Sequence, residues 1–183
     1  MTDLPDLPPA PLDRDALLDY LDAAGLDTLT IDHPAVFTVA ESSALERDMP
    51  PEMAGGGHTK NLFLRDRKNN HFLVTAEQTT EVDLKRLHKV IGGASRFSFG
   101  KSETMVERLG VTPGSVTAFG IVNDRESAVR FVIDENLMRR EWINCHPLTN
   151  EATTAIRRDD LLRLARHCGH DPLIADLTGT DEG

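Results

Sequence analysis

The fold of this chain is decided by residues 60–76, which read KNLFLRDRKNNHFLVTA. Two strand-like apolar runs, residues 60–65 and 71–76, flank a polar stretch that contains Asn69 and Asn70. Asparagine tolerates the left-handed backbone of tight turns, so a polar stretch of this kind between two apolar runs indicates a turn. We therefore predict an antiparallel β-hairpin over these residues.

The segment before the hairpin carries signals for helix starts. Asp13 can cap a first helix that ends near Gly25, and the spacing of Thr38 and Glu41 is that of a capping box for a second short helix. Two prolines and three consecutive glycines make residues 48–59 an expected flexible loop.

Apolar periodicity and turn residues predict the other elements. These are a strand at residues 28–31, a helix capped by Asp83 that carries Leu84, Leu87 and Ile91, a strand at residues 96–99, a helix at residues 103–109 that stops at Gly110, a strand pair at residues 117–122 and 129–133, a short helix near Asn136, a strand at residues 141–145 and a last helix at residues 160–167. Strand pairs joined by local turns, with helices interspersed irregularly, favour an α+β fold with a mixed sheet.

Length and composition bound the organisation of the chain. Its 183 residues, 39% of them hydrophobic, can bury one sizeable core. We expect an extended proline-rich segment at residues 1–12, one domain at residues 13–177 and an acidic tail at residues 178–183. No apolar run reaches bilayer length and residues 1–11 lack the pattern of a secretory signal, so a cytoplasmic protein is expected.

The net charge of −10 is distributed unevenly. Residues 1–50 carry a net −9, whereas residues 51–170 carry a net +3. The overall charge argues against DNA or any extended duplex, because polyanion binding needs a basic footprint. The basic middle of the chain still allows a local phosphate site.

Several familiar chemistries are excluded by spacing. The three glycines at residues 55–57 are followed by neither a phosphate-loop lysine nor a dinucleotide fingerprint. Cys145 and His146 are adjacent on a predicted strand, so their side chains should point to opposite faces rather than form a nucleophilic pair. His167 and His170, near a helix end without a carboxylate at ligand spacing, are expected to be surface histidines, so we predict no metal and no cofactor.

Three short clusters distinguish the chain from a generic domain: residues 60–64 (KNLFL), 110–115 (GVTPGS) and 146–150 (HPLTN). Together they supply a cation at the start of an apolar strand, a glycine-proline loop and an imidazole. A lysine in such a place suits a phosphate, and backbone N–H groups in a rigid turn suit a developing oxyanion. The combination favours an anionic ligand with a cleavable ester.

In this order and context the clusters resemble the YbaK/aminoacyl-tRNA synthetase-associated editing family, and within it the freestanding prolyl-tRNA deacylases, over residues 13–177. The resemblance implies a single domain with a curved, largely antiparallel mixed sheet surrounded by helices. It also implies trans-editing, which is the hydrolysis of mischarged tRNA(Pro), with alanyl-tRNA(Pro) as the substrate. The expected partners are the acceptor end of that tRNA and prolyl-tRNA synthetase, with no membrane and no DNA.

The family's functional residues map onto this chain by motif. Lys60, with Asn61 beside it, is implied to hold the phosphate of the terminal adenosine, and His146 is implied to be the pocket histidine. The glycine-proline loop maps to residues 110–115, where this chain has Gly-x-x-Pro, one residue shorter than the Gly-x-x-x-Pro of many members. We favour the amides of Gly114 and Ser115 as the oxyanion donors.

Other residues are expected to form the substrate pocket. Pro113 and Asn150 belong to the two later clusters, and Val36, Phe37 and Leu62 are candidate walls that admit a methyl group and reject a pyrrolidine ring. We hypothesise ester hydrolysis without a metal, in which the substrate's own ribose hydroxyl orients the water. The alternatives are a cysteinyl-tRNA(Pro) deacylase, a catalytically silent module that binds aminoacyl-tRNA or a synthetase, and a small-ester hydrolase unrelated to tRNA.

Overall fold

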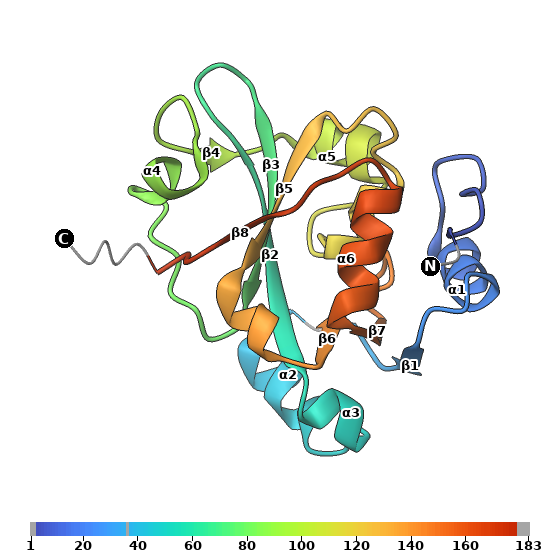
Figure 1. The fold of residues 1–183 in the computed structure, drawn as a ribbon. Helices are drawn as coiled ribbons and strands as arrows, with labels where there is room; N and C mark the ends of the chain where they lie inside the picture. The colour runs from blue at the N-terminus through green and yellow to red at the C-terminus, as the bar shows by residue number, and fades with distance from the viewer. Residues whose placement is uncertain (1–2, 36, 179–183) are drawn as a thin grey trace.

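The computed structural model describes residues 3–35 and 37–178, which form an open, mixed eight-stranded sheet with helices on both faces (Figure 1). The strands are β1 (Thr28–Asp32), β2 (Gly57–Arg65), β3 (His71–Glu77), β4 (Ser98–Phe99), β5 (Val129–Asp134), β6 (Trp142–Cys145), β7 (Ala152–Arg157) and β8 (Leu173–Ala175). Their order is β1-β7-β6-β2-β3-β5-β8, and β4 pairs with β2. The predicted α+β fold with a mixed sheet is confirmed.

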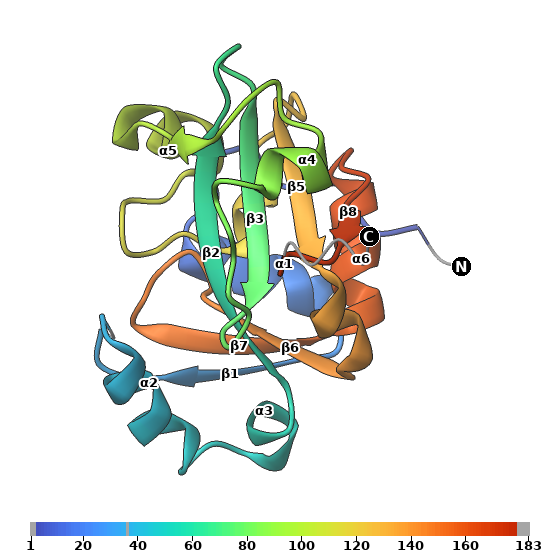
Figure 2. The ribbon, with the colours of Figure 1, turned by 90° about the vertical axis from the view of Figure 1, so that its left-hand side faces the viewer.

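The helices lie around this sheet in the two views of Figures 1 and 2. They are α1 (Arg14–Ala23), α2 (Val39–Glu46), α3 (Pro51–Ala54), α4 (Leu87–Ile91), α5 (Ser102–Leu109) and α6 (Arg158–His167), with the 3-10 helices η1 (Ala118–Val122) and η2 (Glu135–Arg139). The predicted caps at Asp13 and Thr38 are confirmed, the second as a complete capping box with Glu41. None of the helices in the described ranges has the length and apolar character that a bilayer span requires.

Strands β2 and β3 form the predicted antiparallel hairpin. Asp66 holds the turn, because its buried carboxylate accepts hydrogen bonds from the N–H groups of Lys68 (2.8 Å) and Asn70 (2.9 Å). Burial raises the pKa of Asp66, but hydrogen bonds to the carboxylate outweigh that effect and lower the pKa to about 2. Asn69 adopts the left-handed backbone with φ of 64°, as the turn prediction requires.

Strand β2 has two different neighbours along its other edge. Its first residues, Gly57 and His58, pair in parallel with β6, whereas its last residues, Leu64 and Arg65, pair with β4. No described strand pairs with residues 59–62 on this edge. The sheet is therefore open in its middle, beside Lys60.

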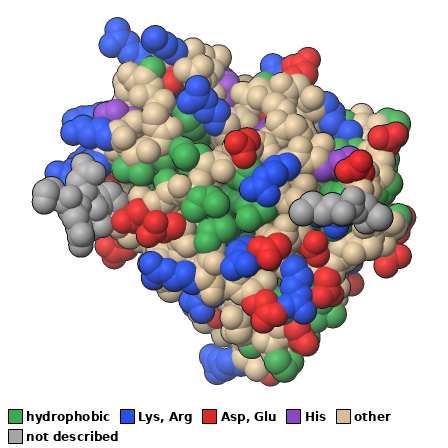
Figure 3. Space-filling view, viewed as in Figure 1, with side chains coloured by type: hydrophobic (Ala, Val, Ile, Leu, Met, Phe, Trp, Pro, Cys, Tyr) green, Lys and Arg blue, Asp and Glu red, His purple; other side chains and the backbone are tan. Residues whose placement is uncertain are grey.

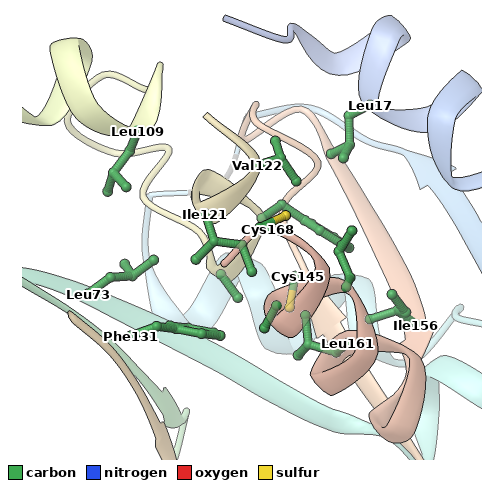
Figure 4. Packing of buried hydrophobic residues seen from close by; sticks show 14 of the residues in the cluster. Leu17, Leu73, Leu109, Ile121, Val122, Phe131, Cys145, Ile156, Leu161 and Cys168 are labelled. Atoms are coloured by element: carbon green, nitrogen blue, oxygen red, sulfur yellow. The ribbon is translucent and has the colours of Figure 1, made fainter. Parts of the chain in front are cut away.

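Alternating side chains of the central strands supply two separate cores. Phe63 and Leu73 belong to the larger cluster, which includes side chains of α1, α5, α6 and η1 (Figure 4). Leu64 and Phe72 belong to a smaller cluster with the buried side chains of α4. Since alternate positions of a strand share a face, Lys60 lies on the same face of β2 as Leu64.

Residues 117–122 do not form the predicted strand. Thr117 accepts a hydrogen bond from the N–H of Phe119 (3.3 Å) and caps η1, whose residues are all buried. A short continuous apolar run fits a buried helix or a buried strand equally well, so its periodicity could not separate the two. The predicted pairing with residues 129–133 is therefore wrong, and β5 pairs in parallel with β3 and β8.

Three further boundaries differ from the prediction. The expected loop at residues 48–59 contains α3 and the first residues of β2. Asp83 begins a hydrogen-bonded turn rather than a helix, and α4 starts only at Leu87. Strands β7 and β8 were not predicted; β7 lies between β6 and the distant β1, and the short β8 is at the edge of the sheet, where it pairs with β5.

Residues 3–12 form no helix or strand but pack against the domain. Leu4 and Leu12 are buried in the larger core. The amide of buried Asn123 accepts from the N–H of Leu12 (2.7 Å) and donates to the carbonyls of Leu12 (3.2 Å) and Leu109 (3.1 Å). The domain boundary at residue 12 stays a prediction, and residues 179–183 of the predicted tail lie outside the described residues.

Replacement of Asn123 by alanine should lower the free energy of unfolding by about 2–3 kcal/mol, because three buried backbone groups lose their partner. Urea denaturation measures the change. Glu103→Ala, at an exposed position of α5, is the control and should change stability by less than about 0.5 kcal/mol. Equal midpoints for the two variants would contradict the bridging role of Asn123.

Candidate active site

A cavity of about 480 Å³ opens beside the unpaired edge of β2. The end of β6, the loop before η1 and the region of α2 supply its other walls. Its lining comprises His33, Phe37, Thr38, Ser42, Leu45, Met49, His58, Thr59, Lys60, Asn61, Gln78, Gly114, Val116, Asn144, Cys145, His146 and Thr153. One hollow therefore collects side chains from segments more than a hundred residues apart in sequence.

Five of the residues predicted for the site line this cavity: Phe37, Lys60, Asn61, Gly114 and His146. They come from each of the three sequence clusters and from the segment before α2. The lysine, the turn glycine and the imidazole thus face a common space.

Four other predicted residues do not line the cavity. Leu62 packs against the smaller core, and Pro113 is exposed at the tip of its turn. Ser115 is buried with its N–H already donated to Thr112, and Asn150 follows a turn in which Leu148 has φ of 61°. Neither pocket role for Leu62 nor an oxyanion role for the Ser115 amide fits this placement.

The candidate wall residue Val36 lies outside the described residues. The apolar walls that the structure does describe are instead supplied by Leu45, Met49 and Val116, together with Phe37. Sequence reasoning predicted Phe37 but missed Leu45, Met49 and Val116, and also His33, His58, Gln78, Asn144 and Thr153. The spacing of His33, Asn144 and Thr153 gives no signal, because the pairing of β1 with β7, β7 with β6 and β6 with β2 brings these distant residues together.

Lys60 reaches the cavity from the open edge of β2. Its side chain is partly buried, and its ammonium donates a hydrogen bond to the carbonyl of Thr80 in the turn after β3. An ammonium has three N–H donors, so this bond fixes its position and leaves donors for an anion. Beside it, Asn61 accepts a hydrogen bond from the hydroxyl of Thr75 (2.6 Å), which anchors the amide side chain to β3.

Gly114 lies in a tight turn closed by the hydrogen bond from the Ser115 N–H to the Thr112 carbonyl (3.0 Å). Gly114 has φ of 92°, a conformation that L side chains rarely adopt. A Cβ at this position would lie 3.9 Å from the ring of Phe37, so the turn and this ring border each other. The N–H of Gly114 has no hydrogen-bond partner within the described residues.

His146 directly follows β6 and is oriented by the backbone of β7. Its Nδ1 lies 3.1 Å from the carbonyl of Ala152 and must carry a hydrogen, since a carbonyl only accepts. Burial lowers the pKa of His146 below its ordinary value, and the neighbouring His33 lowers it further, against the opposing effect of the bond to Ala152. The ring is therefore neutral near pH 7, with Nε2 as an acceptor.

A second imidazole, that of His33, is fixed beside it. Its Nδ1 lies 2.9 Å from the carbonyl of Pro34, and its Nε2 lies 2.8 Å from Oγ1 of Thr153. Because the carbonyl only accepts, Nδ1 carries a hydrogen, and Nε2 bonds to the threonine hydroxyl. His33 thus has both nitrogens occupied, whereas Nε2 of His146 is without a partner in the described part of the chain.

The cavity wall formed by His58 and Asn144 connects the sheet to α2 and α3. His58 Nδ1 lies 3.6 Å from a carboxylate oxygen of Glu46 at the end of α2, and burial lowers the pKa of His58. Asn144 donates to the carbonyl of Met53 in α3 (2.8 Å). Its carbonyl oxygen is buried with no partner in residues 3–35 and 37–178.

Cys145 is unsuited to nucleophilic chemistry. Its side chain lies in the larger core (Figure 4), and burial raises the pKa of its thiol to about 12. This agrees with the prediction that Cys145 and His146 do not form a catalytic pair. Within the described residues no three His, Cys, Asp or Glu side chains are grouped as metal ligands.

One of the two histidines expected at the surface is buried. His167 is exposed and contacts the carbonyl of Pro5 (2.9 Å), but His170 is only 4% exposed and its Nε2 lies 3.5 Å from Asp124. The chain turns inward after Gly169, whose φ of 87° reverses its direction at the end of α6. The expectation for His170 is therefore wrong.

Cations without acidic partners are concentrated in one segment. Residues 65–101 carry a net charge of +4, and none of their Lys or Arg side chains is in an ion pair within the described residues. They are Arg65, Arg67, Lys68, Lys85, Arg86, Lys89, Arg96 and Lys101. In Figure 3, Lys and Arg side chains gather over the tip of the β2–β3 hairpin and over α4, which covers the face of β2 that carries Lys60.

Comparisons with known proteins agree with this geometry. The family model for the aminoacyl-tRNA editing domain matches residues 33–164. The chain is 36% identical to a zebrafish prolyl-tRNA synthetase associated domain-containing protein 1, covering 90% of this chain and 88% of that protein. It is 32% identical to the prolyl-tRNA editing protein ProX of Acetoanaerobium sticklandii, covering 86% and 93%.

The fold is also similar to that of a solved structure described as a candidate trans-editing enzyme for prolyl-tRNA synthetase. The TM-score is 0.62 at 18% identity, covering 88% of this chain and 93% of the other. At this identity the likeness concerns the fold alone.

The imidazole of His146 should titrate with a midpoint below its ordinary value of 6.5, because burial disfavours the charged ring. Its pKa is lower in the folded than in the unfolded state, so folding favours the neutral form and stability should fall as the pH drops below 6.5. NMR titration of the ring protons, assigned with a His146→Gln variant, measures the midpoint. A value at or above 6.5 would contradict this environment.

Proposed function

This chain belongs to the aminoacyl-tRNA editing domain family, and we propose that it hydrolyses mischarged tRNA(Pro), with alanyl-tRNA(Pro) as its substrate. The observation that carries the proposal is the single cavity that Lys60, Gly114 and His146 share. The name of the ProX relative, a prolyl-tRNA editing protein, supports tRNA(Pro) as the acceptor. Association with prolyl-tRNA synthetase and a cytoplasmic location stay predictions.

The terminal adenosine would bind with its phosphate at Lys60. The ammonium donates one hydrogen bond to the carbonyl of Thr80, which leaves two N–H donors, and Lys60 lines the cavity. The aminoacyl ester lies on the opposite side of the ribose from this phosphate, which directs it toward the Gly114 turn and His146 on the other wall. The arrangement thus matches the two ends of one aminoacyl-adenosine.

Hydrolysis would use the N–H of Gly114, which has no partner among residues 3–35 and 37–178, as the donor to the developing oxyanion. The turn is rigid, since the Ser115 N–H closes it on Thr112, so the donor is oriented before the reaction begins. Of the two amides predicted for this role, that of Ser115 is occupied, so we assign the role to that of Gly114. An aminoacyl ester is already activated, so a water oriented by the ribose hydroxyl completes the reaction.

The neutral imidazole of His146 would then hold either the substrate ammonium or the attacking water. Its Nε2 is an acceptor without a partner in the described residues, and Nδ1 is fixed by Ala152. A proton accepted here is disfavoured by burial, which suits orientation better than general base catalysis.

Selection of alanine over proline would depend on the space between Leu45, Met49 and Val116. A synthetase site built for proline cannot exclude the smaller alanine by binding, and a second, smaller sieve is the general solution to this problem. Aliphatic walls reject the pyrrolidine ring sterically and need no polar contact.

A deacylation panel tests this proposal. With alanyl-, cysteinyl-, seryl- and prolyl-tRNA(Pro), alanyl-tRNA should be hydrolysed fastest and prolyl-tRNA slowest. Lys60→Ala should slow single-turnover deacylation at subsaturating enzyme by about tenfold or more, because a charged hydrogen bond to phosphate is lost. Arg139→Ala, which removes an exposed cation of η2, is the matched control.

The outcomes separate the alternatives. Faster loss of cysteine than of alanine would make the chain a cysteinyl-tRNA deacylase. Binding of aminoacyl-tRNA without ester loss would make it a silent module. Unchanged kinetics of Lys60→Ala would refute the phosphate contact.

The salt dependence of the reaction tests the contact with RNA. If Lys68 and Lys89 contact phosphates of the acceptor stem, the double alanine variant should release fewer counterions. Between 50 and 200 mM salt, kcat/KM of the unmodified protein should then fall about tenfold more than that of the variant. A double variant at Arg139 and Arg166 removes the same charge elsewhere and should behave as the unmodified protein; equal slopes for all three would exclude these contacts.

A further inference from the structure

We propose that Asp134 is a positioning residue that sets the location of the Lys60 ammonium through Thr80. The inference rests on the proposed function for the meaning of Lys60 as a phosphate ligand. Asp134 does not line the cavity, and no sequence motif or comparison points to it.

The first link joins Lys60 to the turn after β3. Its ammonium donates to the carbonyl of Thr80, a residue only 5% exposed although it lies outside any helix or strand. The N–H of Thr80 in turn donates to the carbonyl of Glu77 (2.9 Å), which closes the turn. The position of the Lys60 ammonium therefore depends on the backbone of the Glu77–Thr80 turn, and another group must fix that turn.

The second link joins that turn to Asp134. One carboxylate oxygen accepts from the hydroxyl of Thr80 (2.5 Å) and from the N–H of Glu77 (3.0 Å), which are the two ends of the turn. The other oxygen accepts from the N–H of Asn136 (3.0 Å), which ties the carboxylate to the start of η2. The two ends of the Glu77–Thr80 turn thus share one acceptor.

The burial of this carboxylate calls for an explanation. Asp134 is fully buried and forms no ion pair within the described residues. A buried charge without a cation is costly unless hydrogen bonds compensate for it, and here three donors do so, from Glu77, Thr80 and Asn136, which an asparagine with its single acceptor oxygen could not satisfy. The carboxylate of Asp134 polarises Thr80 through its hydroxyl. Because the Thr80 carbonyl accepts from the Lys60 ammonium, this polarisation favours a cation at that carbonyl.

The same turn also places a second group in the cavity. Gln78 lines the cavity, and its N–H donates to the carbonyl of His58 on β2 (2.8 Å). The side chain of Glu77 is held by Arg140 at 2.6 and 3.0 Å. These contacts hold the backbone of the turn without Asp134, so loss of the Thr80 hydroxyl should loosen the ammonium and leave the turn folded.

Binding of adenosine 5′-monophosphate and of adenosine to the full chain tests the proposal without requiring turnover. NMR titration gives both dissociation constants, and their ratio is the preference for phosphate. The unmodified protein should prefer the nucleotide by about tenfold, and Lys60→Ala should abolish the preference. Thr80→Val keeps the carbonyl and removes the hydroxyl, and it should reduce the preference about fivefold.

Two variants separate positioning from structural damage. Thr80→Ser restores the hydroxyl and should restore the preference. Thr80→Val added to Lys60→Ala should have no further effect on nucleotide binding, because two residues of one network are not additive. Asp134→Asn retains the shape of the side chain and should lower the preference for phosphate as Thr80→Val does. It replaces Thr80→Val in the test if Thr80→Val fails to fold.

The kinetic counterpart is a raised KM for alanyl-tRNA(Pro) with kcat within about twofold, as expected for ground-state binding. A preference for phosphate that is unchanged in both Thr80→Val and Asp134→Asn would overturn the proposal. The proposal would also be overturned if Thr80→Val weakened the binding of adenosine 5′-monophosphate and of adenosine equally, because equal weakening indicates general damage to the protein. If alanyl esters are not hydrolysed at all, the proposed function fails, while the nucleotide titration still tests the Asp134 link.

Discussion

The site depends on one constraint, which is that strand β2 cannot pair continuously along both edges. β3 pairs with residues 59–65 along one edge, but on the other edge the pairing with β6 ends at His58 and the pairing with β4 starts only at Leu64. Within this interval residues 59–61 line the wall of a cavity, where a ligand can use their polar groups. Lys60 and Asn61 are in that interval, so the interruption of the sheet and the position of the cation have the same origin.

The other walls follow from how β6 ends. Pro147 cannot continue the strand, and Leu148 takes a left-handed conformation, so the chain reverses and returns as β7. That reversal leaves His146 at the end of β6, and the carbonyl of Ala152 at the start of β7 fixes its ring. Burial then keeps the ring neutral. In the Gly114 turn, the hydrogen bond that closes the turn occupies the amide of Ser115. The neighbouring amide of Gly114 is not used by that bond.

Turn, capping and helix-stop signals in the sequence correctly predicted the elements that depend on short-range interactions. The hairpin, the caps at Asp13 and Thr38, and the helix that stops at Gly110 were found, since each depends on residues within one or two turns of chain. Errors occurred where tertiary packing decides. Residues 117–122 are apolar enough for a strand but are a buried 3-10 helix, and β7 is a strand because β1 and β6 lie on both its sides. Leu62 was expected as a pocket wall and the Ser115 amide as an oxyanion donor, but Leu62 packs against the smaller core and the Ser115 N–H is donated to Thr112.

The sequence by itself determined the family, the α+β class and the chemical inventory of one lysine, one glycine-proline turn and one histidine. These are carried by residue types and short spacings, which do not change on folding. Only the tertiary structure decided which amide is available, which apolar side chains wall the cavity, and that buried Asp134 reaches Lys60 through Thr80. These features depend on contacts between segments that are tens of residues apart. Sequence periodicity does not predict such contacts, because a hydrogen bond across the fold requires no particular sequence spacing between its two residues.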